Sequence, residues 1–223
     1  MRKLRSAVVV GATGLVGSEL VKILCASDNY QAVKVIARRP LDDEHPKLEV
    51  VVKQLHQVAD EDLNGIQDVF CCLGTTRKKA GSKAAFKQVD LDYPLLIAQK
   101  AKAGQVEQFV VISAMGADER SFFYYSQIKG RLENELIRLN FPALSIFRPG
   151  LLTGKRKEYR LFESMGAAVF KILDPLFVGP LQNFRSIPAR QVALAMKNIA
   201  LTADKNTVNV YYTREIRRFG KLD

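Results

Sequence analysis

The chain alternates short runs of apolar, often β-branched residues with longer segments whose apolar residues recur every three to four positions. Runs of the first kind predict buried strands, and segments of the second kind predict helices with one apolar face. Strands are expected at 6–10, 33–37, 48–53, 68–73, 107–113 and 143–147. Helices are expected at 15–26, 83–103, 121–139, 161–173 and 188–201.

Serine and proline residues mark the ends of some of these helices. Ser121 is expected to be the N-cap of the third helix, and Pro188 to open the last one. Pro94 lies inside the second helix, where a proline cannot donate the usual backbone hydrogen bond. We therefore expect this helix either to bend at Pro94 or to start afresh at Asp92.

Strands that alternate with helices are typical of βαβ units, in which helices cover both faces of a parallel sheet. The predicted fold class is therefore α/β, with a doubly wound parallel sheet. A chain of 223 residues, 48% of them hydrophobic, can bury the core of one such domain, so we expect a single domain over residues 1–223. After Phe147, proline and glycine interrupt the pattern, and residues 150–223 are expected to form a small substrate-facing lid instead of another sheet unit.

The formal net charge of +11 invites a nucleic-acid or acidic-membrane partner. However, the basic residues are scattered, with short clusters only at 77–79, 155–157 and 217–218, and no aromatic ladder or nucleic-acid motif accompanies them. We therefore expect no nucleic-acid partner. An anionic cofactor or substrate accounts for part of the charge more simply.

Other residue types restrict the class of protein further. Cys25, Cys71 and Cys72 are odd in number, which predicts reduced thiols, no disulfide framework and a cytoplasmic location. His45 and His56 have no ligand residues at a metal-binding spacing, so no metal site is expected. No apolar run reaches the roughly 18 residues that cross a bilayer, and no membrane span is expected.

The turn GATGLVG at residues 11–17 follows the first predicted strand and opens the first predicted helix. That context is the one a Rossmann-type dinucleotide fingerprint requires. Gly11 permits the sharp turn, Gly14 lets backbone N–H groups approach a pyrophosphate at the helix start, and Gly17 lets helix and strand pack closely. The predicted cofactor contacts in this turn are Gly11, Thr13, Gly14, Leu15, Val16 and Gly17.

The end of the second predicted strand indicates which dinucleotide is bound. An NAD-binding protein usually has an acidic residue there for the ribose 2′-hydroxyl, whereas this chain has Arg38 and Arg39. Two guanidinium groups suit a 2′-phosphate through planar, charged donors. The expected cofactor is therefore NADP(H). The alternative is that both arginines are solvated loop charges.

Candidate catalytic residues lie on the third predicted helix. Tyr125 and Lys129 are four residues apart, which places both side chains on one helix face. A free phenol has a pKa of about 10, and a nearby ammonium stabilises the phenolate, so the pair suits acid/base chemistry near neutrality. Lys129 could also hold the nicotinamide ribose.

Five segments together, GATGLVG, CCLGTTR, FVVISAMGAD, YYSQIKG and IFRPGLLTG, resemble the atypical short-chain dehydrogenase/reductases. The likeness is greatest to their small NADPH-binding branch and covers nearly the whole chain. It implies that Tyr125 is the general acid, that Lys129 is its partner, and that Ser113 donates a hydrogen bond to the substrate carbonyl.

The same resemblance implies further cofactor contacts beyond the glycine turn. Leu73, Gly74 and Thr75 would lie along the adenosine side of the cofactor. Pro149, Gly150 and Leu152 would pass its nicotinamide end.

The chain departs from the family pattern at two positions. Many relatives have Ser-Ser after the fifth strand and use the second hydroxyl, whereas this chain has Ser113 followed by Ala114. Many relatives also have an asparagine in a proton relay on the fourth helix, where this chain has Asp90. Asp90 either replaces that asparagine or is a solvated or capping residue.

Together these features predict an NADP(H)-dependent oxidoreductase that transfers hydride between the cofactor and a small carbonyl or alcohol substrate through Ser113, Tyr125 and Lys129. The segment after residue 150 is short, so the substrate pocket is expected to be shallow or completed by a partner chain, which leaves a homodimer or a protein partner open. The alternative is an NADPH-binding sensor or scaffold with little turnover that regulates a protein partner, because the fold alone does not decide function.

Overall fold

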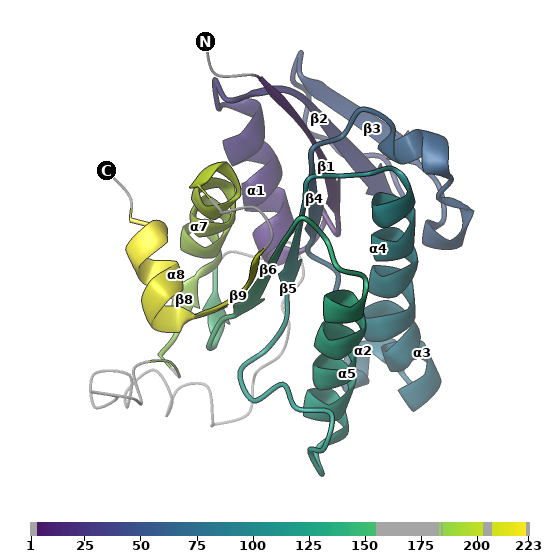
Figure 1. The fold of residues 1–223 in the computed structure, drawn as a ribbon, viewed down its shortest axis with the longest axis vertical. Coiled ribbons are helices and arrows are strands. Elements are labelled where there is room, and N and C mark those ends of the chain that lie inside the picture. The colour runs from purple at the N-terminus through teal and green to yellow at the C-terminus, as the bar shows by residue number, and fades with distance from the viewer. Residues whose placement is uncertain (1–3, 155–182, 184, 203–206, 222–223) are drawn as a thin grey trace.

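The computed structural model describes residues 4–154, 183, 185–202 and 207–221. Seven parallel strands form the main sheet in the order β3-β2-β1-β4-β5-β6-β9 (Figure 1). The strands are β1 (Arg5–Val10), β2 (Tyr30–Ala37), β3 (Leu48–Val52), β4 (Asp68–Cys71), β5 (Gln108–Ile112), β6 (Ala143–Arg148) and β9 (Thr207–Tyr212). The six expected strands are all present, and their order confirms the Rossmann-type doubly wound fold.

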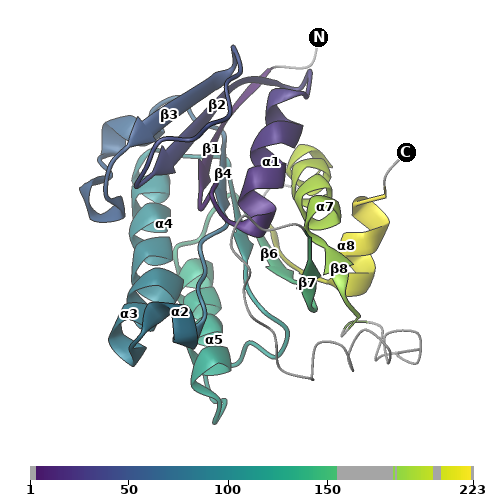
Figure 2. The ribbon, with the colours of Figure 1, turned by 180° about the vertical axis from the view of Figure 1, so that it is seen from behind.

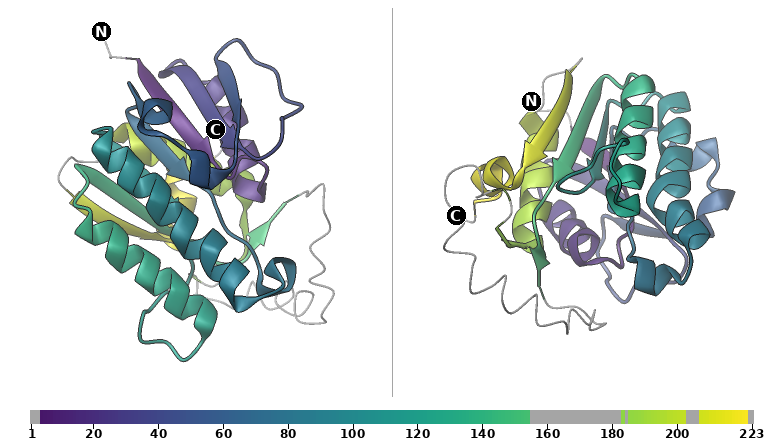
Figure 3. Two further views of the ribbon diagram at one scale, coloured as in Figure 1. Left: turned by 90° about the vertical axis from the view of Figure 1, so that its right-hand side faces the viewer. Right: turned by 90° about the horizontal axis from the view of Figure 1, so that it is seen from below.

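Helices cover both faces of this sheet. One face carries α1 and α7, with α8 beside α7, and the other carries α4 and α5 (Figure 3). The helices are α1 (Leu15–Cys25), α2 (Arg77–Ala80), α3 (Lys83–Lys87), α4 (Tyr93–Ala103), α5 (Tyr124–Arg138), α7 (Ala189–Thr202) and α8 (Thr213–Phe219). Single-turn 3-10 helices at Leu55–Gln57 and Asp60–Leu63 precede β4, and a π-helical turn at Gln88–Asp92 joins α3 to α4.

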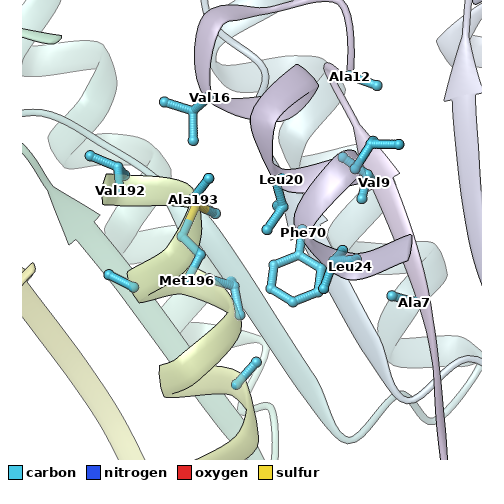
Figure 4. Packing of buried hydrophobic residues seen from close by; sticks show 14 of the residues in the cluster. Ala7, Val9, Ala12, Val16, Leu20, Leu24, Phe70, Val192, Ala193 and Met196 are labelled. Carbon is cyan, nitrogen blue, oxygen red and sulfur yellow. The ribbon is translucent and has the colours of Figure 1, made fainter. Parts of the chain in front are cut away.

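Strand β1 lies in the middle of the sheet and is buried on both faces, which explains its continuous apolar sequence. Successive side chains of a strand point to opposite faces. Val9 therefore packs under α1 and α7, together with Phe70 and Met196 (Figure 4), whereas Val8 joins the core under α4 and α5.

The helix starts differ in detail from the sequence prediction. The prediction of Ser121 as an N-cap is wrong, because α5 begins at Tyr124 and Ser121 accepts a hydrogen bond from the backbone N–H of Phe123 at 3.1 Å, before the helix. Pro188 ends the short strand β8 (Ile187–Pro188), directly before α7. The second helix does not start afresh at Asp92: the helical segment continues without a break from α3 through the π-helical turn into α4, and Pro94 lies in the first turn of α4.

The expectation that no sheet unit follows Phe147 is wrong. β9 pairs in parallel with β6 and adds a seventh strand, and β7 (Leu152–Thr153) forms a separate small sheet with β8 (Figure 2). β9 is an edge strand that is only partly buried, so it lacks the continuous apolar run by which the inner strands were recognised. The expected helix at 161–173 lies outside the described residues.

Candidate functional site

The glycine turn lies where the strand order reverses, because β1 has β2 on one side and β4 on the other. Gly11 has a φ of +85°, and a Cβ there would lie 2.6 Å from the backbone carbonyl of Cys72. Gly14 donates its backbone N–H to the Gly11 carbonyl at 2.9 Å and provides no side-chain cap for α1. The first N–H groups of α1 are therefore left for an anion, as a dinucleotide pyrophosphate requires.

Gly17 fixes how closely α1 approaches this turn. A Cβ at Gly17 would lie 2.3 Å from the carbonyl oxygen of Gly11, well inside van der Waals contact. The obstruction is backbone and not a flexible side chain, so it can be relieved only by moving the start of the helix. The residues of the turn thus form a cradle that side chains would fill.

We expect Gly17→Ala to abolish tight NADPH binding and to lower the free energy of unfolding by about 1–3 kcal/mol, the usual effect of overpacking. The added methyl displaces the start of α1 from the turn, where the pyrophosphate is expected. Fluorescence titration with NADPH and urea unfolding measure the two effects. Ser18→Ala, one residue further along α1, is the matched control, and an NADPH affinity equal to that of the parent in Gly17→Ala would contradict the prediction.

Other predicted cofactor contacts also follow strands at the carboxyl edge of the sheet. Arg38 and Arg39 follow β2 and are exposed, while Leu73 to Thr75 follow β4. Carboxyl ends of neighbouring parallel strands meet at one edge, so these segments flank the glycine turn on its two sides. After β6, Gly150 donates its backbone N–H to the Thr213 hydroxyl at 2.8 Å, and Leu152 lies in β7.

Tyr125 lies in the first turn of α5 and is 41% exposed. Its ring packs on the fully buried ring of Phe86 in α3, with 5.8 Å between the ring centroids. One turn further along α5, Lys129 is only 3% exposed. The same helix therefore carries a partly exposed phenol and, one turn further along, a buried ammonium.

Lys129 pairs with Asp90, with 2.9 Å between the ammonium nitrogen and Oδ1. Burial by itself lowers the pKa of Lys129, but the negative charge of Asp90 and the electrostatic interaction with Tyr125 raise it, and the net pKa lies above its ordinary value. Lys129 therefore stays protonated at neutral pH. A buried cation that interacts electrostatically with Tyr125 is thus held one helical turn further along α5.

Asp90 is 1% exposed, so the interpretation of this residue as a solvated group is wrong. It lies in the π-helical turn before α4, and its Oδ2 accepts a hydrogen bond from the backbone N–H of Thr75 at 2.8 Å. A Cβ at Gly74 would be 3.5 Å from Asp90 Oδ1. Asp90 thus joins the loop after β4 to the ammonium of Lys129.

Ser113 follows β5 directly and is 4% exposed. Its hydroxyl donates a hydrogen bond to Glu133, a carboxylate that is itself 3% exposed. Glu133 also pairs with Arg148 at 2.5 Å, and Arg148 donates to the Tyr212 hydroxyl at 3.2 Å. The hydrogen bond of the Ser113 hydroxyl is therefore directed to another side chain of the protein. Its role toward a substrate stays a prediction.

Sequence reasoning missed Glu133 and Gly130. Glu133 lies four residues after Lys129 and eight after Tyr125, so a carboxylate on the same helix face as these two residues was the available signal. Gly130 lets the loop before α5 cross the helix, since a Cβ there would lie 2.2 Å from the backbone nitrogen of Glu119. The close approach of the loop to Gly130 is a tertiary contact, so no pattern in the sequence around Gly130 predicts it.

Several residue types carry no site in the described part of the chain. His45 and His56 are exposed, and within the described ranges no three His, Cys, Asp or Glu side chains gather closely enough to hold a metal ion. Cys25, Cys71 and Cys72 are free thiols. None of the helices described is both long and apolar enough to cross a bilayer.

The sheet order, the glycine turn at the switch point and the uncapped start of α1 define a Rossmann-type, oxidoreductase-like NAD(P)-binding protein. Consistent with this, residues 11–168 match the model of the NAD(P)H-binding family, and the chain belongs to that family. The predicted resemblance to the atypical short-chain dehydrogenase/reductases is confirmed at this level.

Named relatives support the assignment along nearly the whole chain. The chain is 34% identical over 222 residues to rat "Protein HTATIP2", covering 97% of this chain and 90% of that protein. It is 34% identical over 223 residues to "Protein FMP52-1, mitochondrial" of Scheffersomyces stipitis, covering 97% and 99%. A Debaryomyces hansenii relative, "Protein FMP52, mitochondrial", is 39% identical over 69% of each chain.

Solved structures share the fold at low sequence identity. MoeE5 in complex with UDP-glucose and NAD matches 95% of this chain and 79% of its own, with a TM-score of 0.71 and 16% identity. The UDP-N-acetylglucosamine 4-epimerase of Methanobrevibacter ruminantium matches 97% and 81%, with a TM-score of 0.70 and 16% identity. These likenesses confirm the Rossmann-type fold.

The prediction of a cytoplasmic location is wrong. It was inferred from the free cysteines, yet fungal relatives from Debaryomyces hansenii, Scheffersomyces stipitis and Coccidioides immitis are all described as mitochondrial. Free cysteines indicate only a reducing environment and do not distinguish one compartment inside the cell from another.

Proposed function

We propose that this protein is an NADP(H)-dependent oxidoreductase of the short-chain dehydrogenase type that interconverts a carbonyl compound and an alcohol. The observation that carries the proposal is the exposed Tyr125 one helical turn from the buried, Asp90-paired ammonium of Lys129. An aromatic hydroxyl that interacts electrostatically with a fixed cation suits proton transfer at a substrate oxygen. The glycine cradle at the switch point supports a dinucleotide beside this pair.

In the direction of reduction, bound NADPH would supply a hydride to the carbonyl carbon. The Tyr125 hydroxyl donates its proton to the carbonyl oxygen, which becomes the alcohol oxygen. The phenolate that remains on Tyr125 is stabilised by the ammonium of Lys129, and Asp90 keeps that ammonium charged. In the direction of oxidation, the same phenolate accepts the alcohol proton.

Arg38 and Arg39 are the proposed determinants of NADP(H) over NAD(H). Both follow β2, are exposed, and belong to the strand end at which an NAD-binding protein carries its acidic residue. The ion pairs found within the described residues include neither Arg38 nor Arg39. No such pair therefore competes with a 2′-phosphate for these two arginines. Their charged, planar donors fit such a phosphate.

The variant Arg38→Ala/Arg39→Ala is expected to raise the Kd for NADPH about tenfold to a hundredfold, because each hydrogen bond to a charged group contributes about 1.5–3 kcal/mol. The Kd for NADH should change little, since NADH has no 2′-phosphate. Isothermal titration with both dinucleotides measures the two values, with Arg131→Ala, an exposed arginine of α5, as control. Equal losses for NADPH and NADH would contradict the assignment.

The activity itself is tested by incubating the protein with NADPH and a panel of aldehydes, ketones and quinones while nicotinamide absorbance is followed. Oxidation of NADPH that depends on both protein and carbonyl supports the proposal. NADPH binding without turnover on any member of the panel would sink it.

That second outcome would favour an NADPH-binding sensor or scaffold that regulates a protein partner. One observation supports this alternative: the Ser113 hydroxyl donates its hydrogen bond to Glu133 and not to a substrate position. Ala114 follows Ser113, so no second serine hydroxyl is present there. Polarisation of a carbonyl would then depend on Tyr125 alone, unless Ser113 leaves Glu133. Possession of both Tyr125 and Lys129 favours the enzyme, because a sensor has no need of a proton donor.

A further inference from the structure

Two adjacent phenylalanines in the loop before α5 belong to neither core cluster of the described residues. Phe122 is 104% exposed and Phe123 is 78% exposed, the two highest values among large apolar side chains of the described residues. Single exposed apolar residues are ordinary on a protein surface. Two neighbouring aromatic rings that are nearly or fully solvated are not, and such a pair suggests that something apolar covers them.

Basic side chains surround the same end of the molecule. The ammonium of Lys83 in α3 lies 5.4 Å from the ring centroid of Tyr124, the residue after Phe123, and the Tyr124 hydroxyl donates to the Lys83 carbonyl at 3.2 Å. The short helices α2 and α3 and the start of α5 lie together at the lower end of the molecule (Figures 1 and 2). The exposed cations at this end are Arg77, Lys78, Lys79, Lys83 and Arg120.

Two exposed acidic residues, Asp118 and Glu119, also belong to this loop. The Asp118 carboxylate accepts a hydrogen bond from the backbone N–H of Arg120 at 2.8 Å, and Glu119 accepts one from the Asn134 amide at 2.6 Å. Both carboxylates therefore have partners within the loop and α5. The cations outnumber them, so the charge of this end is positive.

We infer that this aromatic–basic end, made of Phe122, Phe123 and the five cations, docks on an anionic lipid surface. Aromatic rings enter the boundary between headgroups and acyl chains, while lysine and arginine contact anionic headgroups, and stable attachment requires both signals. Lysine is depleted at protein–protein interfaces, so a lysine-rich surround favours lipid over a protein partner. The net charge of the whole chain, +11, is also positive and therefore favours an anionic surface. Docking is independent of whether the protein turns over a substrate.

The test is co-sedimentation of the full chain with vesicles of phosphatidylglycerol and phosphatidylcholine in equal amounts, compared with vesicles of phosphatidylcholine alone. The parent should bind the anionic vesicles, and added salt should weaken the binding. Phe122→Ser/Phe123→Ser should lower the partition coefficient about a hundredfold or more, because two aromatic rings no longer leave water when the protein docks. Lys78→Gln/Lys83→Gln should lower the partition coefficient about thirtyfold, because two contacts between lysine and anionic headgroups are lost.

Matched controls remove similar groups elsewhere. Ile137→Ser deletes an exposed apolar side chain at the other end of α5, and Lys22→Gln/Arg138→Gln deletes two exposed cations away from the loop. Both controls should partition like the parent. All these residues are exposed, so folding is expected to be retained, and circular dichroism checks it.

Three results would overturn the inference. The first is a parent that does not sediment with anionic vesicles. The second is a Phe122→Ser/Phe123→Ser variant that sediments as well as the parent. The third is a parent that dimerises through the two phenylalanines in the absence of vesicles. A second copy of the chain, and not lipid, would then cover the two rings.

Discussion

Replacing Tyr125 with phenylalanine is expected to lower kcat for any carbonyl substrate found with the panel by about 10² to 10⁴-fold, the usual contribution of a positioned acid or base. Only the hydroxyl is lost. The ring still packs on Phe86, so the fold and the Kd for NADPH should be unchanged. Steady-state kinetics and NADPH titration measure the two quantities on the same preparation.

Tyr124→Phe is the matched control for this experiment. Its ring also packs on Phe86, at 5.9 Å between centroids, but its hydroxyl donates to the backbone carbonyl of Lys83 and lies off the face that carries Lys129. Activity should therefore survive in Tyr124→Phe. If Tyr125→Phe reduced its substrate as fast as the parent, the proposed mechanism would be falsified.

Removing the carboxylate of Asp90 should have the largest effect on stability. Asp90→Ala leaves the ammonium of Lys129 buried without a partner, and breaking such a pair costs about 3–5 kcal/mol. Urea unfolding at neutral pH measures the loss. Asp92→Ala, two residues away, breaks an exposed pair with Lys87 and should cost less than about 1 kcal/mol.

The pH dependence of this loss separates an unpaired charge from a general packing defect. With Asp90 present, the pKa of Lys129 is raised, so its stabilising contribution is complete at neutral pH and is lost as the pH rises through that raised value. Without Asp90, burial lowers the pKa of Lys129, and the penalty disappears once the unfolded lysine also loses its proton, above about pH 10.4.

The gap in stability between parent and Asp90→Ala should therefore narrow at alkaline pH. Asp90→Ala/Lys129→Met should recover much of the stability at neutral pH, because no charge is then buried. A gap that stays constant with pH, together with no recovery in the double variant, would show that Asp90 acts by packing and not by charge.

The sheet could be predicted to the extent that its strands were buried on both faces. The inner strands, such as β1 and β5, are continuous apolar runs. β9 is only partly buried at the sheet edge, and it belongs to the sheet because its backbone pairs with β6. Its membership in the sheet therefore depended on a neighbour that is distant in sequence.

Partners of buried polar groups could not be predicted in the same way. The sequence left open whether Asp90 was solvated, and it marked Ser113 for a substrate. In the folded chain Asp90 meets Lys129 from α5, while Ser113 meets Glu133, which in turn is held by Arg148. The residues of each pair are at least 15 positions apart in the sequence.

The glycine turn, the arginines after β2 and the spacing of Tyr125 and Lys129 were determined by the sequence alone. Each depends on one turn or one helix, whose geometry the local sequence sets. The tertiary structure decided what surrounds them: the carboxylate that keeps Lys129 charged, the bond that engages Ser113 and the solvated rings of Phe122 and Phe123. These features result from packing between distant segments, since burial and charge pairing exist only once those segments meet.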